Sequence, residues 1–164
     1  MLIRPTTESD WATLKAVRLA ALLDAPTAFG VSHQAASAYT EAQWRQRAAF
    51  TGSAFWLAFD ADGEAVGMIG GVVDDGGHYN LIGMWVAPGQ RGSDAARGLV
   101  DAVKAHAIAR GHDRIVLDVA PENARAARFY LNRGFVFLDE WEPLASHPGI
   151  RVQKMAWTAG QAGR

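Results

Sequence analysis

One run of thirteen residues sets the architecture expected of this chain: Met84-Trp85-Val86-Ala87-Pro88-Gly89-Gln90-Arg91-Gly92-Ser93-Asp94-Ala95-Ala96. An apolar strand ends at Pro88-Gly89, a glycine-bearing turn follows, and a helix begins near Asp94. The first N–H groups of a helix lack partners within it, and the helix dipole makes that end partly positive. Such an end beside an open strand is a site for phosphate, and Arg91 adds a fixed cation. An ordinary strand–turn–helix connection is the alternative, since short glycine turns are weak signals alone.

A second motif lies about thirty residues downstream, after another predicted strand: Asn123-Ala124-Arg125-Ala126-Ala127-Arg128-Phe129-Tyr130-Leu131-Asn132-Arg133-Gly134-Phe135. Together with Val86-x-Pro88-x-x-Arg91-Gly92, it resembles the GCN5-related N-acetyltransferase (GNAT) family. The phosphate loop of that family is Gln/Arg-x-x-Gly-x-Gly/Ala, and its next motif is Asn-x-x-Ala-x-x-x-Tyr followed by Gly-Phe. The resemblance covers roughly residues 66–137, and Asp94 replaces the inner glycine of the family's loop.

Composition limits the class of protein. Of the 164 residues, 49% are hydrophobic and 20% charged, which is ordinary for a globular protein of one domain, here residues 1–164. A net charge of −1 gives no reason to expect attraction to nucleic acid or to a membrane. Between Pro88 and Arg133, eight Arg or Lys stand against five Asp or Glu, so this segment carries +3 and the remainder −4. A locally basic half suits an anionic ligand, although charges on two exposed helices would look the same.

Several classes of site are excluded or unexpected. The chain has no cysteine, which rules out disulfides, thiolate zinc sites and cysteine nucleophiles, and no metal site is expected. The first residues, Met1-Leu2-Ile3-Arg4-Pro5, lack the apolar run of a signal peptide, and no stretch approaches membrane-spanning length. A cytoplasmic location is therefore the default expectation.

Hydrophobic periodicity and turn residues predict the order of the elements. The predicted strands are 2–5, 55–59, 65–73, 78–86, 114–119, 135–141 and 151–156, and the predicted helices are about 9–23, 44–48, 94–110 and 123–132. Capping-box patterns at Thr7–Asp10 and Thr40–Gln43 open the first two helices, and Gly111 and Gly134 end the last two. A proline-containing loop is expected between the last two strands.

These elements predict an α/β fold with a mixed, mostly antiparallel central sheet of about seven strands and helices on both faces. The unit 78–119 places its helix between two strands that should be parallel neighbours. The resemblance implies that those strands form a splayed pair, whose unpaired backbone groups hold the pantetheine arm of acetyl-CoA as an added strand. The cofactor-binding residues that it implies are Met84, Trp85, Val86, Arg91, Gly92, Ser93, Asp94, Ala95, Ala96, Asn123 and Arg133.

The resemblance also implies an acid. Acetyl transfer from a thioester to an amine benefits from a group that protonates the leaving thiolate. Tyr130 stands seven residues after Asn123 and matches the family's tyrosine, which faces the splay. A core tyrosine beside Phe129 is the alternative. Asn123 matches the family residue that binds the cofactor or orients the loop, and a helix N-cap role is compatible with this.

The general base is less well defined. Some family members carry an acidic residue eight positions before the valine of Val-x-Pro, and His78 occupies that position here. Histidine titrates near neutrality and can take a proton directly or through water. A solvated histidine at the mouth of the Asp74–Gly77 hairpin turn is the alternative, and Glu41, Glu64 and His33 are further candidates. Water with backbone carbonyls suffices if the amine arrives neutral.

Asp94 departs from the family pattern. A carboxylate is favourable at a helix N-terminus, yet it competes with a bound phosphate for the same positive end. Two anions about 5 Å apart in an exposed loop repel by about 1 kcal/mol after screening. We therefore expect Asp94 to weaken the binding of coenzyme A, with Arg91, Arg97 or Arg133 available to compensate.

The segments expected at the front of the site supply Arg18, Phe29, Tyr39, Trp44, Phe50, Trp56, Trp141 and His147. This set suits a small amine with an apolar or aromatic body better than a polyamine, and a peptide N-terminus stays open. The sequence thus predicts an acetyl-CoA-dependent N-acetyltransferase with a small-molecule amine acceptor, no nucleic-acid or membrane partner, and a homodimer left open. A non-catalytic acyl-CoA or effector-binding module that retains the fold is the alternative. A nucleotidase is disfavoured, because no Lys-Ser or Lys-Thr follows the glycine turn.

Overall fold

A computed structural model describes residues 1–92, 94–120 and 123–160, so Ser93, one of the predicted cofactor-binding residues, lies outside the described residues. The strands are β1 (Leu2–Pro5), β2 (Ala54–Phe59), β3 (Ala65–Val73), β4 (Tyr79–Val86), β5 (Arg114–Val119), β6 (Val136–Leu144) and β7 (His147–Thr158). The helices are α1 (Trp11–Asp24), α2 (His33–Ser37), α3 (Glu41–Ala48), α4 (Ala95–Ala109) and α5 (Ala124–Asn132), with short 3-10 turns η1 (Glu8–Asp10) and η2 (Pro88–Gln90).

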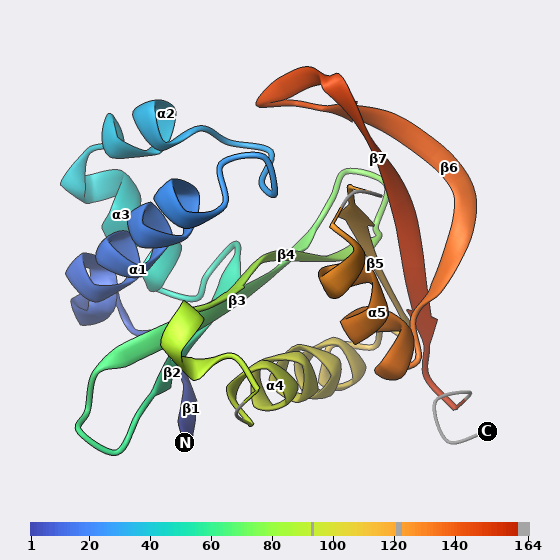
Figure 1. Ribbon diagram of the computed structural model, residues 1–164. Coiled ribbons are helices and arrows are strands. Elements are labelled where there is room, and N and C mark those ends of the chain that lie inside the picture. Colours follow the sequence, from blue (N-terminus) through green and yellow to red (C-terminus); the bar gives the residue numbers. More distant parts are fainter. Residues whose placement is uncertain (93, 121–122, 161–164) are drawn as a thin grey trace.

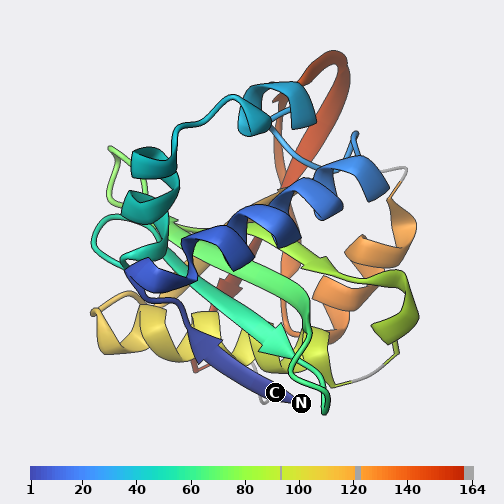
Figure 2. The ribbon, with the colours of Figure 1, turned by 90° about the vertical axis from the view of Figure 1, so that its left-hand side faces the viewer.

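The strands form a mixed sheet with helices on both sides. Their order is β1-β2-β3-β4-β5-β7-β6. β4 and β5 are parallel, and the other neighbouring pairs are antiparallel. Helices α1, α2 and α3 lie on one face and α4 and α5 on the other, as the two views in Figures 1 and 2 show. The predicted fold class is confirmed.

Two apolar layers hold the helices to the sheet. On one face Leu14 and Val17 of α1, three residues apart, pack with Trp44 of α3 against β2 and β3. On the other face Leu99 and Val103 of α4, four residues apart, pack into the layer that also holds residues of β2 to β5. Spacings of three and four place apolar side chains on one side of a helix, so each helix presents one face to the sheet.

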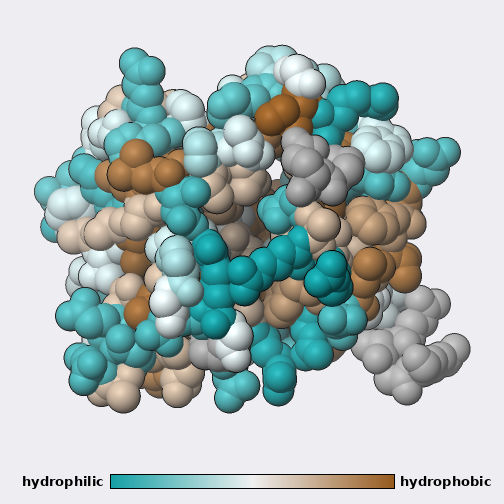
Figure 3. Space-filling model, in the orientation of Figure 1, coloured by the Kyte–Doolittle hydropathy of each residue, from teal (hydrophilic) through white to brown (hydrophobic). Residues whose placement is uncertain are grey.

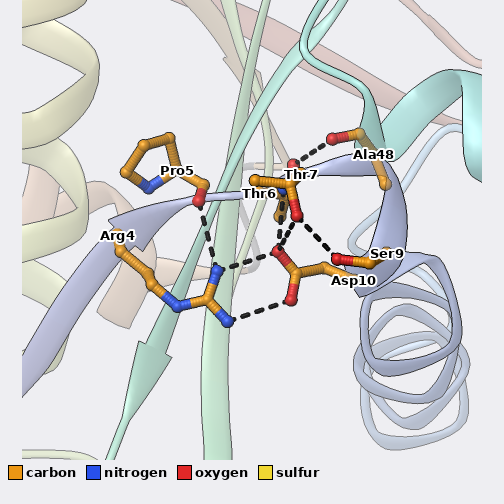
Figure 4. Close-up of polar contacts among 7 residues, drawn as sticks. All are labelled: Arg4, Pro5, Thr6, Thr7, Ser9, Asp10 and Ala48. Atoms are coloured by element: carbon orange, nitrogen blue, oxygen red, sulfur yellow. Dashed lines mark hydrogen bonds and ion pairs between the residues drawn. The ribbon is translucent and has the colours of Figure 1, made fainter.

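The start of α1 is fixed by a carboxylate. Asp10 accepts hydrogen bonds from the backbone N–H of Thr7 at 2.8 Å and from the Arg4 guanidinium at 2.8 and 2.9 Å (Figure 4). The pKa of Asp10 falls to about 2, chiefly because of the hydrogen bond from Arg4. Next to it, the buried Thr6 hydroxyl donates to the carbonyl of Ala48 at 2.8 Å, which ties β1 to the end of α3 (Figure 4). The capping box predicted at Thr7–Asp10 is confirmed.

The predicted elements fail in two places. The five-residue helix α2 was not predicted. The proline-containing loop before the last strand was also wrong, because β6 runs to Leu144 and β7 begins at His147. Pro143 and Pro148 lie where β6 and β7 extend beyond β5, which pairs with β7 only from Gln153 onward. Proline is tolerated there because it lacks only a donor that an edge strand does not need.

None of the helices in the described ranges is long and apolar enough to span a membrane.

Candidate functional site

β4 and β5 are joined at one end only. Among their residues, all of which are described, the paired positions are Tyr79 with Ile115 and Asn80 with Val116. β4 nevertheless continues to Val86, paired there with β3. The two strands therefore splay apart as expected (Figure 1). A strand edge opened in this way can accept an extended ligand as an added strand.

A bulge bends β4 at the splay. Two of its residues, Gly83 and Met84, lie opposite the single β3 residue Ile69. Gly83 has a φ of 61°, a conformation that side chains with a Cβ rarely adopt. A Cβ at this position would also lie 2.9 Å from Nη1 of Arg18. Glycine is thus required at position 83 for two reasons, its backbone conformation and the closeness of Arg18. Bulges of this kind are common beside active sites because they redirect a strand edge.

A cleft of about 410 Å³ runs along the open edge of β4. Its lining includes seven of the predicted cofactor-binding residues and the predicted acid: Met84, Trp85, Val86, Arg91, Gly92, Ala96, Asn123 and Tyr130. Because Ala96 lies in the first turn of α4, the partly positive end of that helix borders the cleft. The cleft therefore combines an open strand edge with a positive helix end, as a phosphate-bearing ligand with an extended arm requires.

Asp24, the last residue of α1, connects β4 to the loop that follows it. Its Oδ2 accepts hydrogen bonds from Nε1 of Trp85 at 3.0 Å and from the guanidinium of Arg91 at 2.6 Å. These two bonds lower the pKa of Asp24 from its ordinary value, the bond from Trp85 contributing most. Arg91 is thus held at the cleft, with part of its charge neutralised by Asp24.

Of the predicted cofactor-binding residues that the structure describes, three do not line the cleft. The Asp94 side chain is 84% exposed, and its carboxylate lies 3.9 Å from the Arg97 guanidinium. Ala95 is fully buried, and Arg133 lies just beyond α5, where its carbonyl accepts from Lys104 at 2.6 Å. The Asp94 carboxylate is solvated, as the sequence estimate assumed, and the nearby Arg97 guanidinium offsets part of its repulsion of a phosphate.

His78, the candidate base, also lies outside the cleft and the cavity described below. It follows the β3–β4 turn, its side chain is 58% exposed, and its Nδ1 lies 3.3 Å from the Asp74 carboxylate. This placement favours the solvated alternative. The other candidates, Glu41, Glu64 and His33, are likewise absent from the described residues that line either space.

A cavity of about 520 Å³ adjoins the cleft and shares Met84, Asn123 and Tyr130 with it. The floor of the cavity is formed by parts of β4 and β5, and its roof by the loop after α1 and the β6–β7 turn. The two parts of the roof touch, because the Ser146 hydroxyl donates to the carbonyl of Phe29 at 2.5 Å. Figure 3, in the orientation of Figure 1, shows a hollow near the centre of the surface, between the side of α1 to α3 and the side of β6 and β7.

Tyr130 lies where the cleft and the cavity meet. Tyr130 is 7% exposed, and its ring packs edge-on against Phe129 and Phe135, with centroid distances of 5.4 and 5.5 Å. Burial raises the pKa of Tyr130 above its ordinary value, so the phenol is a neutral proton donor at physiological pH. Asn123 caps α5 through a 3.4 Å bond from the Ala126 N–H to its side chain, and it lines both spaces. The two roles considered for Asn123 are therefore compatible.

Two carboxyl groups that were not identified from the sequence also line the cavity, Asp118 of β5 and Glu142 of β6. The negative charge of Asp118 and a hydrogen bond with it raise the pKa of Glu142. Lys154 of β7 lies 3.2 Å from Asp118. Glu142 therefore binds a proton more readily than an isolated carboxylate does. Asp118 is the one charged residue in the otherwise apolar run 115–119, which was the available signal for it.

Arg18 of α1 brings positive charge to the same cavity. Its guanidinium lies over the Phe29 ring, 5.1 Å from the ring centroid. Desolvation is the main cause that lowers the pKa of Arg18, and its buried Nη1 has no hydrogen-bond partner among the residues that the structure describes. Arg18 and Phe29 are thus the two residues expected at the front of the site that line this cavity.

The other residues expected at the front of the site are dispersed. Trp44 is 2% exposed in the core, and Phe50 and Trp56 pack around His106 on the other face of the sheet. Trp141 is 41% exposed beneath Arg151. The sequence pattern therefore did not distinguish aromatic residues of the core from those that line the site.

Within residues 1–92, 94–120 and 123–160, no group of three or more His, Asp or Glu side chains is arranged to hold a metal ion.

The chain was compared with known proteins. The profile of the acetyltransferase (GNAT) family matches residues 19–135. No curated protein matches the chain.

Several solved structures share the fold. A ribosomal-protein-alanine N-acetyltransferase from Brucella melitensis is 19% identical over 96% of this chain and 99% of its own, with a TM-score of 0.74. A GCN5-related N-acetyltransferase from Kribbella flavida is 20% identical over 96% of both chains, also with a TM-score of 0.74. The Salmonella typhimurium protein yncA, whose structure was determined with its cofactor acetyl-CoA, is 19% identical over 96% of this chain and 93% of its own, with a TM-score of 0.72.

Proposed function

Because the chain belongs to the acetyltransferase (GNAT) family, we propose that it transfers an acetyl group from acetyl-CoA to the primary amine of a small molecule. One observation carries the proposal: a neutral, buried Tyr130 lies at the junction of an open strand edge and an adjoining cavity. The cavity of about 520 Å³ has the size of a small-molecule site.

The lining of the cleft is compatible with acetyl-CoA. Backbone groups of Met84, Trp85 and Val86 would bind the pantetheine arm along the open edge of β4. Arg91, Gly92 and Ala96, which line the cleft, would contact the pyrophosphate at the positive end of α4. Arg125, which lines the cleft from α5, offers a further cation. Acetyl-CoA, when bound, supplies the acetyl group as an activated thioester.

Two groups of the chain would manage the protons. Tyr130 holds a proton at its Oη, available to the leaving thiolate. Asp118 and Glu142 form an acceptor for the proton of the amine, directly or through one water. We assign the base to this carboxyl pair rather than to His78, whose side chain lies outside the cavity.

Release of free thiol from acetyl-CoA, measured with pools of amines, tests the proposal. We expect release to depend on both the amine and the protein, and mass spectrometry to identify an acetylated amine. Saturable acetyl-CoA binding without thiol release in any pool would contradict the proposal and favour the non-catalytic acyl-CoA-binding module.

A further inference from the structure

Arg18 is a largely buried cation, and no counter-charge pairs with it among the described residues. Its Nη1 atom is shielded from solvent and has no hydrogen-bond partner in that part of the chain. In the described ranges Arg18 also makes no ion pair. A guanidinium stays charged in proteins, and burying a charge without a partner is costly. Since Arg18 lines the cavity, an anion bound in the cavity would supply the missing partner.

Among the described residues, the groups that face Arg18 leave its positive charge largely uncompensated. Arg47 acts on Arg18 as a like charge and helps to lower its pKa. Phe29 offers the face of its ring, and Gly83 offers backbone without a Cβ, so neither neutralises the charge. The α1 side of the cavity is therefore positive.

The other side of the cavity is negative. Asp118 and Glu142 line it from β5 and β6, across the β4–β5 splay from α1. Lys154 lies 3.2 Å from Asp118 and its charge also acts on Glu142, so one positive charge stands against two carboxyl groups. The proximity of the two carboxyl groups favours the binding of a proton or of an ammonium group between them.

We propose that the acceptor is a small amino carboxylic acid, such as a free amino acid, whose carboxylate binds Arg18 and whose amino group faces the Asp118–Glu142 pair. The negative carboxylate of the ligand then lies beside the positive side of the cavity, and its amino group lies beside the negative side. A plain amine would leave Arg18 buried and unpaired. The inference rests on the acetyl transfer proposed above and names the class of its acceptor.

The first test uses the unmodified protein and a matched series of acceptors. The free amino acids are assayed by thiol release. The best substrate among them is then compared with its amide, with the amine formed by its decarboxylation, and with a dipeptide that has this amino acid at its N-terminus. We expect kcat/KM to fall about 100-fold from the acid to the amide or amine, because the carboxylate and Arg18 form a desolvated charge pair. Equal rates for the acid and the amine would overturn the inference and leave acetyl transfer intact. A dipeptide that reacts better than the free acid would overturn it in favour of a peptide acceptor. No thiol release with any amine would instead refute the proposed function.

The second test uses Arg18→Gln, with Arg45→Gln as the matched control, because Arg45 is an exposed arginine of α3 that pairs with Glu41. Binding of the amino acid to protein saturated with coenzyme A is measured by calorimetry, and acid and amide are compared in the assay. We expect Arg18→Gln to raise KM for the acid about 100-fold and to bring the acid and amide to similar rates, as loss of a buried charge pair predicts. The affinity for coenzyme A and the behaviour of Arg45→Gln should match the unmodified protein.

The ratio of the rates with the acid and the amide shows whether Arg18 binds the carboxylate or only supports the fold. A merely structural role for Arg18 would lower the melting temperature and leave the ratio of the two rates unchanged, which would overturn the inference. Arg18→Lys, which keeps the charge without the planar fork, should restore part of the discrimination.

Discussion

Tyr130→Phe removes one oxygen from the point where the cleft and the cavity meet, and we expect it to lower kcat about 100- to 10,000-fold, the usual contribution of a positioned acid. This range corresponds to about 3–5 kcal/mol of activation free energy. The ring should stay in place because Phe129 and Phe135 pack against its carbons at centroid distances of 5.4 and 5.5 Å. Folding stability should therefore change by at most about 1 kcal/mol, and the affinity for coenzyme A by little.

The matched control is Tyr79→Phe. Tyr79 is also a buried phenol, 2% exposed, but its hydroxyl bonds Nδ1 of His106 at 2.8 Å, away from the cleft and the cavity. This variant should lose about 1 kcal/mol of stability and keep kcat. Thiol release, calorimetry with coenzyme A and chemical denaturation measure the three quantities. A kcat for Tyr130→Phe within about threefold of the unmodified protein, too small for a lost proton donor, would refute the assignment.

The pH profile provides a second check on Tyr130. Burial favours the neutral phenol and raises its pKa above the ordinary value of 10.0, so the proton is retained throughout the range in which the assay is run. We expect no loss of kcat from Tyr130 ionisation between pH 7 and about pH 9, well below the ordinary phenol pKa. A decline over that range that Tyr130→Phe abolishes would show that the phenol ionises more easily than its burial predicts.

Three further variants test separate parts of the structure. Asp10→Asn should lower the free energy of unfolding at pH 7 by about 1–2 kcal/mol, since it breaks a charge-assisted pair with the 39%-exposed Arg4. The pKa of Asp10 is about 2 against an ordinary 3.8, so this stabilisation is complete above about pH 4 and is lost as the pH falls towards 2; a stability difference unchanged at pH 2 would contradict the assignment. Gly83→Ala should lower the free energy of unfolding by about 1–2 kcal/mol because φ is positive at this position, and it should raise the KM for the acceptor because the new Cβ displaces Arg18. Gly52→Ala is the control, since an added Cβ there meets nothing within 4 Å, and it should change neither quantity. Asp94→Gly should change coenzyme A affinity by less than about threefold because the carboxylate is 84% exposed, and a tenfold tightening would mean that it faces the phosphates.

Local sequence signals predicted most of the fold. Apolar residues three and four apart predicted α1 and α4. Gly111 and Gly134, with φ of 85° and 91°, follow the ends of α4 and α5 as expected. Helix α2 was missed because five residues, capped by Ser32, are too few to show a period. The sequence predicts a proline-containing loop in place of the β6–β7 turn because proline disfavours a paired strand, and only the tertiary pairing shows that Pro143 and Pro148 lie beyond the end of β5.

The site was predictable where its residues are contiguous and not where the fold brings distant residues together. The two motifs gave Met84 to Val86, Arg91, Asn123 and Tyr130. The link between Asp24 and Arg91 spans 67 residues, and the approach of Asp118 to Glu142 depends on two strands that both neighbour β7. No local pattern encodes such contacts. His78 was named by its spacing from Val86, but its side chain follows the turn rather than facing the cavity.

Amide hydrogen exchange with and without saturating acetyl-CoA tests the central claim most directly, namely that the open edge of β4 holds the acyl carrier. We expect slower exchange in Leu81–Val86, where β4 has parted from β5, and unchanged exchange in β1, which lies at the far edge of the sheet. Saturated binding that leaves exchange in Leu81–Val86 unaltered would contradict the account.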